Sequence, residues 1–232
     1  MNILRLFTRR DAGDRIRVFW ATGRAVRGSF LVAMPDIDDA PIAAELAVAR
    51  LLLEDRNACG HDKTGTGLVM TFSFGAVKKL MREASAKAHL APYALFLRTR
   101  FLGCDCRIDP EPDPAYLDTE AAPEDLVVTG PVAEFIRVGA HPEVAVTAHA
   151  VEKFQERFCP NPKKVWSRLQ KYAAEALPYE RRRRNAVHDA KHRQKAEYAL
   201  AHSLGGDPVL FVIGDARPQA GRKLLTVTGA RV

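Results

Sequence analysis

The fold of the first half is decided by the stretch Pro41–Arg107, which contains PIAAELAVARLLLEDRNACG (41–60), GLVMTFSFGAVKKL (67–80) and YALFLRTRFLGCDCR (93–107). Apolar residues recur at helical spacing in its first part, which predicts a helix from Pro41 to about Arg56. A proline in the first turn suits this start, because the backbone N–H that it lacks would have no partner there. The compact apolar run Leu68–Phe74 predicts a buried strand after the helix.

Further elements are expected on both sides of this pair. Polar and apolar residues alternate over Arg15–Trp20, and Gly28–Met34 is mostly apolar, so two strands are expected before the helix. A second helix is expected over Ser85–Leu97, with a kink or split at Pro92 because proline interrupts helical hydrogen bonding. Phe101–Ile108 is expected to form another strand.

The composition changes after this strand. The segment DPEPDP (109–114) is acidic and rich in proline, so it cannot form a helix or a central strand. We therefore expect a first domain over residues 1–110, a linker over 111–130 and a second domain over 131–232. In the second domain the pattern predicts helices at 147–158, with Thr147 as N-cap, and at 163–177, followed by strands at 196–204, 209–214 and 223–228.

Charge separates the two halves of the chain. The net charge is +7, but residues 1–130 hold 17 Lys and Arg against 18 Asp and Glu, whereas residues 131–232 hold 18 against 10. The excess positive charge therefore lies in the second half. This asymmetry favours a polyanionic partner, with nucleic acid as the first candidate and an acidic protein as the second.

Composition predicts a cytoplasmic protein that does not enter a membrane. No apolar run approaches the ~20 residues of a membrane helix, and the N-terminal MNILRLFTRR lacks the features of a secretory signal. Four cysteines form no disulfide framework in a chain of this size, so reduced thiols are expected. The pairs Cys59/His61 and Cys104/Cys106 are spaced more tightly than structural zinc ligands usually are. We therefore expect neither a metal nor another cofactor.

The order of elements in the first domain, with Ala44-Glu45-Leu46 on its long helix, resembles the ribonuclease H-like fold. This resemblance implies an α/β domain with a mixed sheet and flanking helices. In that family, two Asp residues at strand ends and a Glu on the first helix hold the metal ions. Laid on this chain, the Glu matches Glu45, but the Asp positions fall near Ala21 and at Phe72, directly before Ser73.

The resemblance therefore implies a lost nuclease site. Two divalent ions about 3.5–4 Å apart need several carboxylate oxygens, and one carboxylate cannot hold both. Other acids in the domain do not fall at matching strand ends; these are Asp36, Asp38, Asp39 and Asp109. Taken alone, Glu45 is interpreted as an exposed helix residue or a partner of the helix dipole.

The second domain is predicted to be a small basic α+β unit of two helices and three strands, which resembles the RelE-type ribonuclease toxins of bacterial toxin–antitoxin pairs. Those toxins cleave RNA without metal, through basic and acid–base side chains. Here the resemblance points to His149, Lys153 and Arg157, which share one helix face, and to Arg222. The alternative is a solvated basic stripe on an amphipathic helix, and we favour that alternative.

The densest charge of the chain follows the second helix of this domain. It comprises Arg181, Arg182, Arg183, Arg184, His188, Lys191, His192, Arg193 and Lys195. Cations in such a run contact phosphates without reading sequence. We expect nucleic-acid contacts from this run and from Lys153 and Arg157.

The sequence thus favours a non-catalytic protein that binds RNA or DNA through its second domain. The first domain would be a scaffold or a protein-docking unit, as would suit an accessory factor of a plasmid, phage or other mobile element. Two alternatives stay open: a metal-independent endoribonuclease of RelE-like type, and an adaptor with an acidic protein partner. The pattern carries no signal of oligomeric state.

Overall fold

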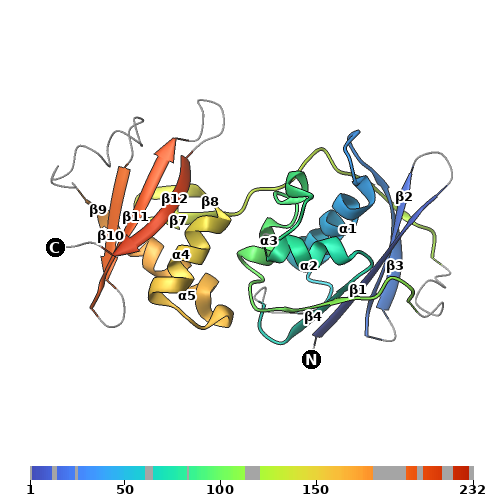
Figure 1. The fold of residues 1–232 in the computed structure, drawn as a ribbon, viewed down its shortest axis with the longest axis horizontal. Helices are drawn as coiled ribbons and strands as arrows, with labels where there is room; N and C mark the ends of the chain where they lie inside the picture. The colour runs from blue at the N-terminus through green and yellow to red at the C-terminus, as the bar shows by residue number, and fades with distance from the viewer. Residues whose placement is uncertain are drawn as a thin grey trace. The chain divides into compact units, whose positions relative to one another are not determined.

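The structure is a computed structural model that describes residues 2–11, 15–23, 26–60, 65–82, 84–112, 121–179, 197–202, 206–215 and 222–229. The chain divides into two compact units, Met1–Val132 and Ala133–Val232. Each unit contains helices and a six-stranded mixed sheet, so the expected α/β class is confirmed (Figure 1). Among the described residues, none of the helices combines the length and the apolar character that a bilayer-spanning helix needs.

The first unit is built on a sheet with the strand order β5-β4-β1-β2-β3-β6. The strands are β1 (Asn2–Arg10), β2 (Ile16–Thr22), β3 (Val26–Ala33), β4 (Leu68–Phe72), β5 (Asp105–Ile108) and β6 (Glu124–Val127). β1, β2 and β3 are antiparallel neighbours, whereas β4 runs parallel to β1 and β5 parallel to β4. β1 therefore lies in the middle of the sheet, between β4 and β2.

The helices of this unit lie on one side of the sheet (Figure 1). α1 (Ala40–Arg50) packs on β1 and β2 and continues into one π-helical turn, η1 (Leu51–Asp55). α2 (Gly75–Met81), the 3-10 turn η2 (Ala88–Leu90) and α3 (Leu95–Arg98) follow. Side chains of all these helices share one hydrophobic core with β1 to β4.

Four expected elements of the first unit are confirmed, one is shorter than expected and one is wrong. The helix that begins near Pro41 and the strands β2, β3 and β4 lie where the pattern predicted them. The strand expected over Phe101–Ile108 forms only over its last four residues, as β5. The expected helix over Ser85–Leu97 is wrong, because only η2 and the one-turn α3 form there. Pro92 lies between these two short helices, at a position where its ring and its missing N–H break helical hydrogen bonding.

Two strands of the first sheet were not expected from the sequence. β1 was missed because apolar side chains occupy both of its faces, with Ile3 next to Leu4 and Leu6 next to Phe7, so simple alternation is hidden. β6 lies inside the segment expected to be a linker, where it pairs in parallel with β3. The boundary between the units accordingly follows Val132.

The second unit contains a sheet with the strand order β7-β8-β12-β11-β10-β9. The strands are β7 (Phe135–Val138), β8 (His141–Val146), β9 (Leu177–Pro178), β10 (Glu197–His202), β11 (Pro208–Asp215) and β12 (Arg222–Gly229). β8 runs parallel to β12, and the other neighbours are antiparallel. α4 (Ala148–Phe158) packs against β12, and α5 (Pro162–Ala174) against β7 and β10.

The expected helices and the three closing strands of the second half are all present. Thr147 caps α4 as predicted, because its hydroxyl accepts a hydrogen bond from the Ala150 N–H at 3.2 Å. The β7–β8 hairpin and the two-residue β9 were not expected. The β7–β8 hairpin turns at Gly139, whose φ of 55° lies in the left-handed region that favours glycine.

A glycine in the first unit offers a test of its packing. A Cβ on Gly65 would lie 2.5 Å from the Leu102 carbonyl oxygen and 2.6 Å from that of Phe101, both backbone atoms. Gly65→Ala should therefore force a backbone shift and lower the free energy of unfolding by about 1–3 kcal/mol.

The matched control is Gly75→Ala at the start of α2, where a Cβ would meet nothing within 4 Å. Alanine favours a helix over glycine, so this variant should be as stable as the parent or slightly more so. Urea unfolding of both variants makes the comparison. Equal stabilities would contradict the described packing of the loop before β4 against residues 101–104.

Candidate functional site

A buried polar cluster joins α1 to the ends of β1 and β4. Glu45 of α1 is fully buried, and its Oε1 accepts hydrogen bonds from the Ser73 N–H at 2.9 Å and from the Ser73 hydroxyl at 2.6 Å. The Ser73 Oγ in turn accepts the Thr8 N–H at 2.9 Å. Because β1 and β4 are parallel neighbours, Thr8 and Ser73 lie at the same edge of the sheet, where the helix delivers Glu45.

Burial controls the charge state of this cluster. It raises the pKa of Glu45 from 4.5 to about 7, because removal from water disfavours the carboxylate. The two hydrogen bonds from Ser73 oppose this effect and lower the pKa, and Thr8 contributes a smaller lowering. Glu45 Oε2 and Thr8 Oγ1 nevertheless have no partner of good hydrogen-bond geometry. The cluster therefore holds a carboxyl that is easily protonated near neutral pH.

This chemistry does not suit a pair of divalent ions. Mg²⁺ and similar hard cations require several oxygen ligands, with more than one carboxylate in a two-metal site. The cluster offers one carboxyl and two hydroxyls. Within the described part of the chain, no group of three or more His, Cys, Asp or Glu side chains is arranged to hold a metal ion.

The structure corrects the expected positions in this site. Ala21 was placed at the first Asp position on the assumption that residues 15–20 form the first strand. The first strand is β1, and Ala21 lies on β2 opposite Arg5. Thr8 is the β1 residue that lies next to Glu45, and Ser73, not Phe72, is the β4-end residue that meets the carboxyl. Glu45 is buried, so its interpretation as an exposed helix residue was wrong.

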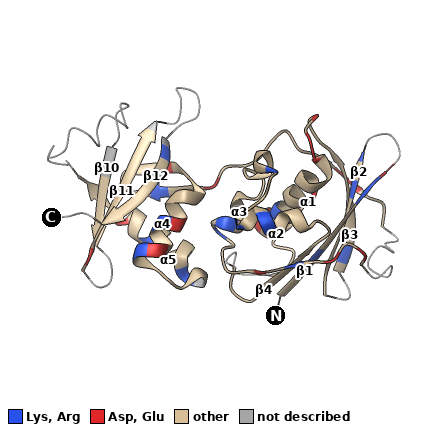
Figure 2. Cartoon of the chain, in the orientation of Figure 1, with Lys and Arg blue, Asp and Glu red and all other residues tan. Residues whose placement is uncertain are grey.

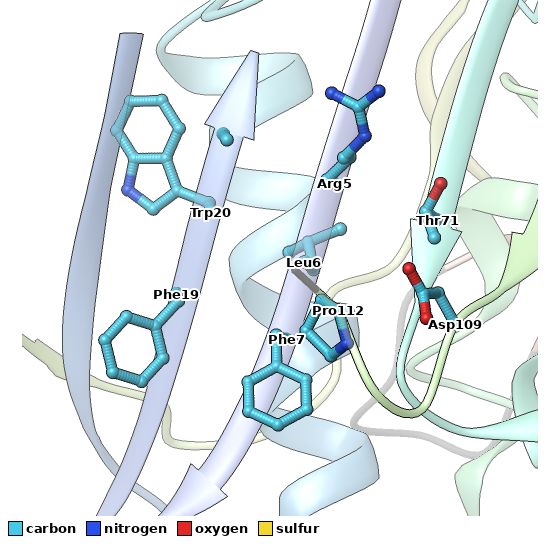
Figure 3. Close-up of a pocket in the computed structure, with 9 residues that line it drawn as sticks. Arg5, Leu6, Phe7, Phe19, Trp20, Thr71, Asp109 and Pro112 are labelled. Carbon is cyan, nitrogen blue, oxygen red and sulfur yellow. The ribbon is translucent and has the colours of Figure 1, made fainter. Parts of the chain in front are cut away.

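The other acids considered as replacement ligands do not reach this cluster. Asp39 binds Lys87, with a carboxylate to Nζ distance of 2.6 Å, just before α1. Asp109 lines a hollow that also contains Arg5 and Phe7 on the sheet (Figure 3). Asp36 and Asp38 lie in the loop between β3 and α1. The positions expected to hold Asp, Ala21 and Phe72, carry no carboxylate, and these other acids do not complete a three-carboxylate site with Glu45.

In the second unit, the expected helix face is partly engaged in structural contacts. The Lys153 Nζ binds the Glu156 carboxylate at 2.6 Å and lowers the pKa of that glutamate. Arg157 donates to the Val227 carbonyl of β12 at 3.2 Å, whereas His149 is exposed near the helix start. Arg222 begins β12 near the N-terminal end of α4, since Thr147 donates to the Leu224 carbonyl at 2.9 Å. Arg157 and Arg222 therefore lie toward opposite ends of α4.

The densest run of positive charge cannot be placed in this geometry. Arg181, Arg182, Arg183, Arg184, His188, Lys191, His192, Arg193 and Lys195 all lie outside the described residues. The expectation that they contact phosphate rests on the sequence.

The cysteines have the properties of unreactive core thiols. Burial raises the pKa of Cys59 to about 11, of Cys104 to about 12 and of Cys106 to about 11. Thiolates, which are the reactive and metal-binding form, are therefore scarce at neutral pH. His61, the fourth residue of the zinc alternative, lies outside the described residues.

Comparison with known proteins adds no relative to this description. No protein-family model matches the chain, and neither a curated protein nor a solved structure matches it. The function must therefore be inferred from the residues themselves.

The buried carboxyl predicts a pH-dependent stability. The pKa of Glu45 is higher in the folded state, about 7, than its ordinary value of 4.5. Its protonation therefore supports the fold fully below pH 4.5, and this support is lost as the pH rises to 7. The loss amounts to about 3 kcal/mol. Glu45→Gln, which keeps a hydrogen-bond acceptor for Ser73, should gain about this much relative to the parent between pH 4.5 and pH 8.

Urea unfolding at several pH values measures this difference. Glu143→Gln on β8 is the control for removal of one exposed carboxylate. A difference between Glu45→Gln and the parent that stays constant across this range would refute the described burial of the carboxyl.

Proposed function

We propose that this chain is a nucleic-acid-binding protein that does not use two-metal chemistry. In this proposal the first unit is a ribonuclease H-like domain whose metal site has been replaced by the Thr8–Glu45–Ser73 cluster. The second unit and its basic run hold the phosphate backbone. An accessory role for a mobile element would suit this combination.

The order of elements supports the proposed relationship of the first unit. Three antiparallel strands are followed by a helix, and then by two strands that extend the sheet in parallel from β1. The Glu on the first helix meets the end of the next strand directly before α2. The resemblance expects a metal ligand from the helix at this place, so the position of Glu45 supports the proposed relationship.

The observation that carries the proposal is the composition of the cluster. Where several carboxylates would repel one another and attract divalent ions, this chain has a threonine, a serine and one carboxyl of raised pKa. Ser73 donates to Glu45 and accepts the Thr8 N–H, so hydrogen bonds within the protein link the three residues in a chain. The site therefore has the character of a structural contact that keeps the older arrangement of elements.

Charge supports the second part of the proposal. Residues 131–232 hold 18 Lys and Arg against 10 Asp and Glu, and nine basic residues, His included, fall between Arg181 and Lys195. Each phosphate that such a run contacts releases counterions, so affinity should depend steeply on salt and little on sequence.

Substitution of the arginine cluster tests this assignment. Replacing Arg181, Arg182, Arg183 and Arg184 by Gln should weaken binding to a single-stranded oligonucleotide. The slope of log affinity against log salt should become shallower by about 3, because four phosphate contacts are removed. Fluorescence anisotropy over a range of salt concentrations gives both quantities.

The control removes the same charge elsewhere, through Gln at the exposed positions Lys78, Lys79, Lys164 and Lys171. Equal effects of the two sets would show that net charge alone, and not the arginine cluster, drives binding. No binding by the parent at low salt would favour an adaptor with an acidic protein partner.

The RelE-like alternative makes a different prediction. A metal-independent ribonuclease would cleave labelled RNA in EDTA, and this cleavage would be lost in His149→Ala. Lys153 binds Glu156, and Arg157 binds the β12 backbone, so both side chains already have partners within the protein. We therefore expect the RNA to stay intact with the parent and with His149→Ala. Gel analysis of the RNA after incubation decides between the two functions.

A further inference from the structure

The face of the first sheet opposite its helices has an unusual composition. Side chains alternate between the two faces of a strand, and paired residues on neighbouring strands share a face. Leu4, Leu6 and Thr8 point toward the helices, so Arg5, Phe7 and Arg9 point to the other side. The strand register extends this second face across β2 and β3 in three rows: Arg5–Ala21–Arg27, Phe7–Phe19–Ser29 and Arg9–Arg17–Leu31.

An aromatic row therefore lies between two rows that contain arginine. Figure 3 shows the rings of Phe7 and Phe19 side by side on β1 and β2. Successive rows on one face are about 7 Å apart, because each is two residues further along the strand. Side chains of neighbouring rows can therefore touch.

The guanidinium groups of Arg9 and Arg17 lie over the Phe19 ring. The guanidinium carbons of Arg9 and Arg17 lie 5.3 and 4.8 Å from the centre of the Phe19 ring, within the range of cation–π interaction. Arg17 also donates from Nε and Nη2 to the Ser29 hydroxyl at 3.3 and 3.2 Å. These contacts restrain the two guanidinium groups near the sheet before any ligand arrives, which lowers the entropy cost of binding.

The four central strands carry no acidic residue. β1, β2, β3 and β4 contain five arginines and no Asp or Glu, and Figure 2 marks positively charged positions in blue on β1, β2 and β3. Two described acids of this side of the sheet lie on its outer strands: Asp105 on β5 binds Arg107 at 2.7 Å, and Asp125 on β6 lies 3.6 Å from Arg15. Asp109 and Pro112 lie against the sheet beside Arg5 and Phe7 (Figure 3).

We propose that this face of the first sheet, defined by Arg5, Phe7, Arg9, Arg17, Phe19 and Arg27, binds single-stranded nucleic acid. The arginines supply charge for phosphates. The partly exposed Phe7 ring and the flat guanidinium groups of Arg9 and Arg17 supply surfaces on which unpaired bases stack. This inference deepens the proposed function, on which it rests, by naming the form of nucleic acid and adding a second contact surface.

The combination favours a single strand over a duplex. In a duplex the faces of internal bases are covered by their neighbours, so aromatic and guanidinium planes at a sheet surface have nothing to stack on. In a single strand, every base offers a π-face, and stacking tolerates any sequence. A purely acidic peptide would satisfy the arginines but would make no use of the partly exposed Phe7 ring.

The test compares two matched double variants of the full chain. Phe7→Leu/Arg9→Gln removes a ring and a charge two residues apart on the proposed face. Phe135→Leu/Arg137→Gln makes the same changes at exposed positions two residues apart on β7. Circular dichroism and thermal unfolding first establish that both variants are folded.

Affinities are then measured by fluorescence anisotropy for a labelled oligothymidine 12-mer and for a 12-base-pair duplex. We expect the β1 variant to bind the single strand about tenfold more weakly than the parent, given the usual contribution of one stacked base. Its affinity for the duplex should change less than threefold, and the β7 variant should match the parent with both ligands. Equal loss for single strand and duplex, or no loss at all, would overturn the inference.

Binding to the duplex, and binding by the variant that lacks Arg181–Arg184, show whether this inference or the proposed function fails. If the parent binds the single strand and the duplex, and only replacement of Arg181–Arg184 weakens this binding, the proposed function stands and the sheet-face inference fails. If the β1 variant alone loses the single strand, the sheet face is the contact surface and the assigned role of the basic run fails. A parent that binds an oligoglutamate peptide but neither oligonucleotide would overturn both.

Discussion

The first unit depends on one buried carboxyl. Glu45 reaches from α1 into the edge of the sheet, where the Ser73 N–H and hydroxyl both donate to one of its oxygens, and Ser73 also receives the Thr8 N–H. These hydrogen bonds fix the position of the helix relative to two parallel strands, which apolar packing alone specifies less sharply because it has no direction. Burying a carboxyl is costly, and the raised pKa of Glu45 reports that cost.

In the proposed function, this cluster lets the first unit keep a ribonuclease H-like order of elements without a set of metal ligands. The hydroxyl and backbone N–H of Ser73 both donate to one oxygen of the Glu45 carboxyl, so that oxygen is satisfied within the protein. The proposed function depends on surface residues and not on this buried cluster. It assigns phosphate contacts to the basic run of the second half and, through the further inference, stacking to the open face of β1, β2 and β3.

The sequence predicted individual helices and strands better than it predicted which strands and side chains lie next to one another. The helix at Pro41, the Thr147 cap and the apolar run of β4 were identified because each has a short-range signature. β1 was missed because both of its faces are apolar near its start, and this error placed the first Asp position at Ala21. The Phe7 and Phe19 neighbourhood depends on strand register, which pairs residues 12 positions apart. No local pattern could have brought Thr8 and Ser73 together, since they are 65 residues apart.

A single experiment can follow one labelled single-stranded RNA through binding and recovery in the presence of Mg²⁺ or Mn²⁺. Native electrophoresis measures the bound fraction, and denaturing electrophoresis of the same complexes measures the length of the recovered RNA. We expect a shifted complex from which the RNA is recovered at full length with either metal. Metal-dependent shortening of the bound RNA that disappears in Glu45→Gln would contradict it.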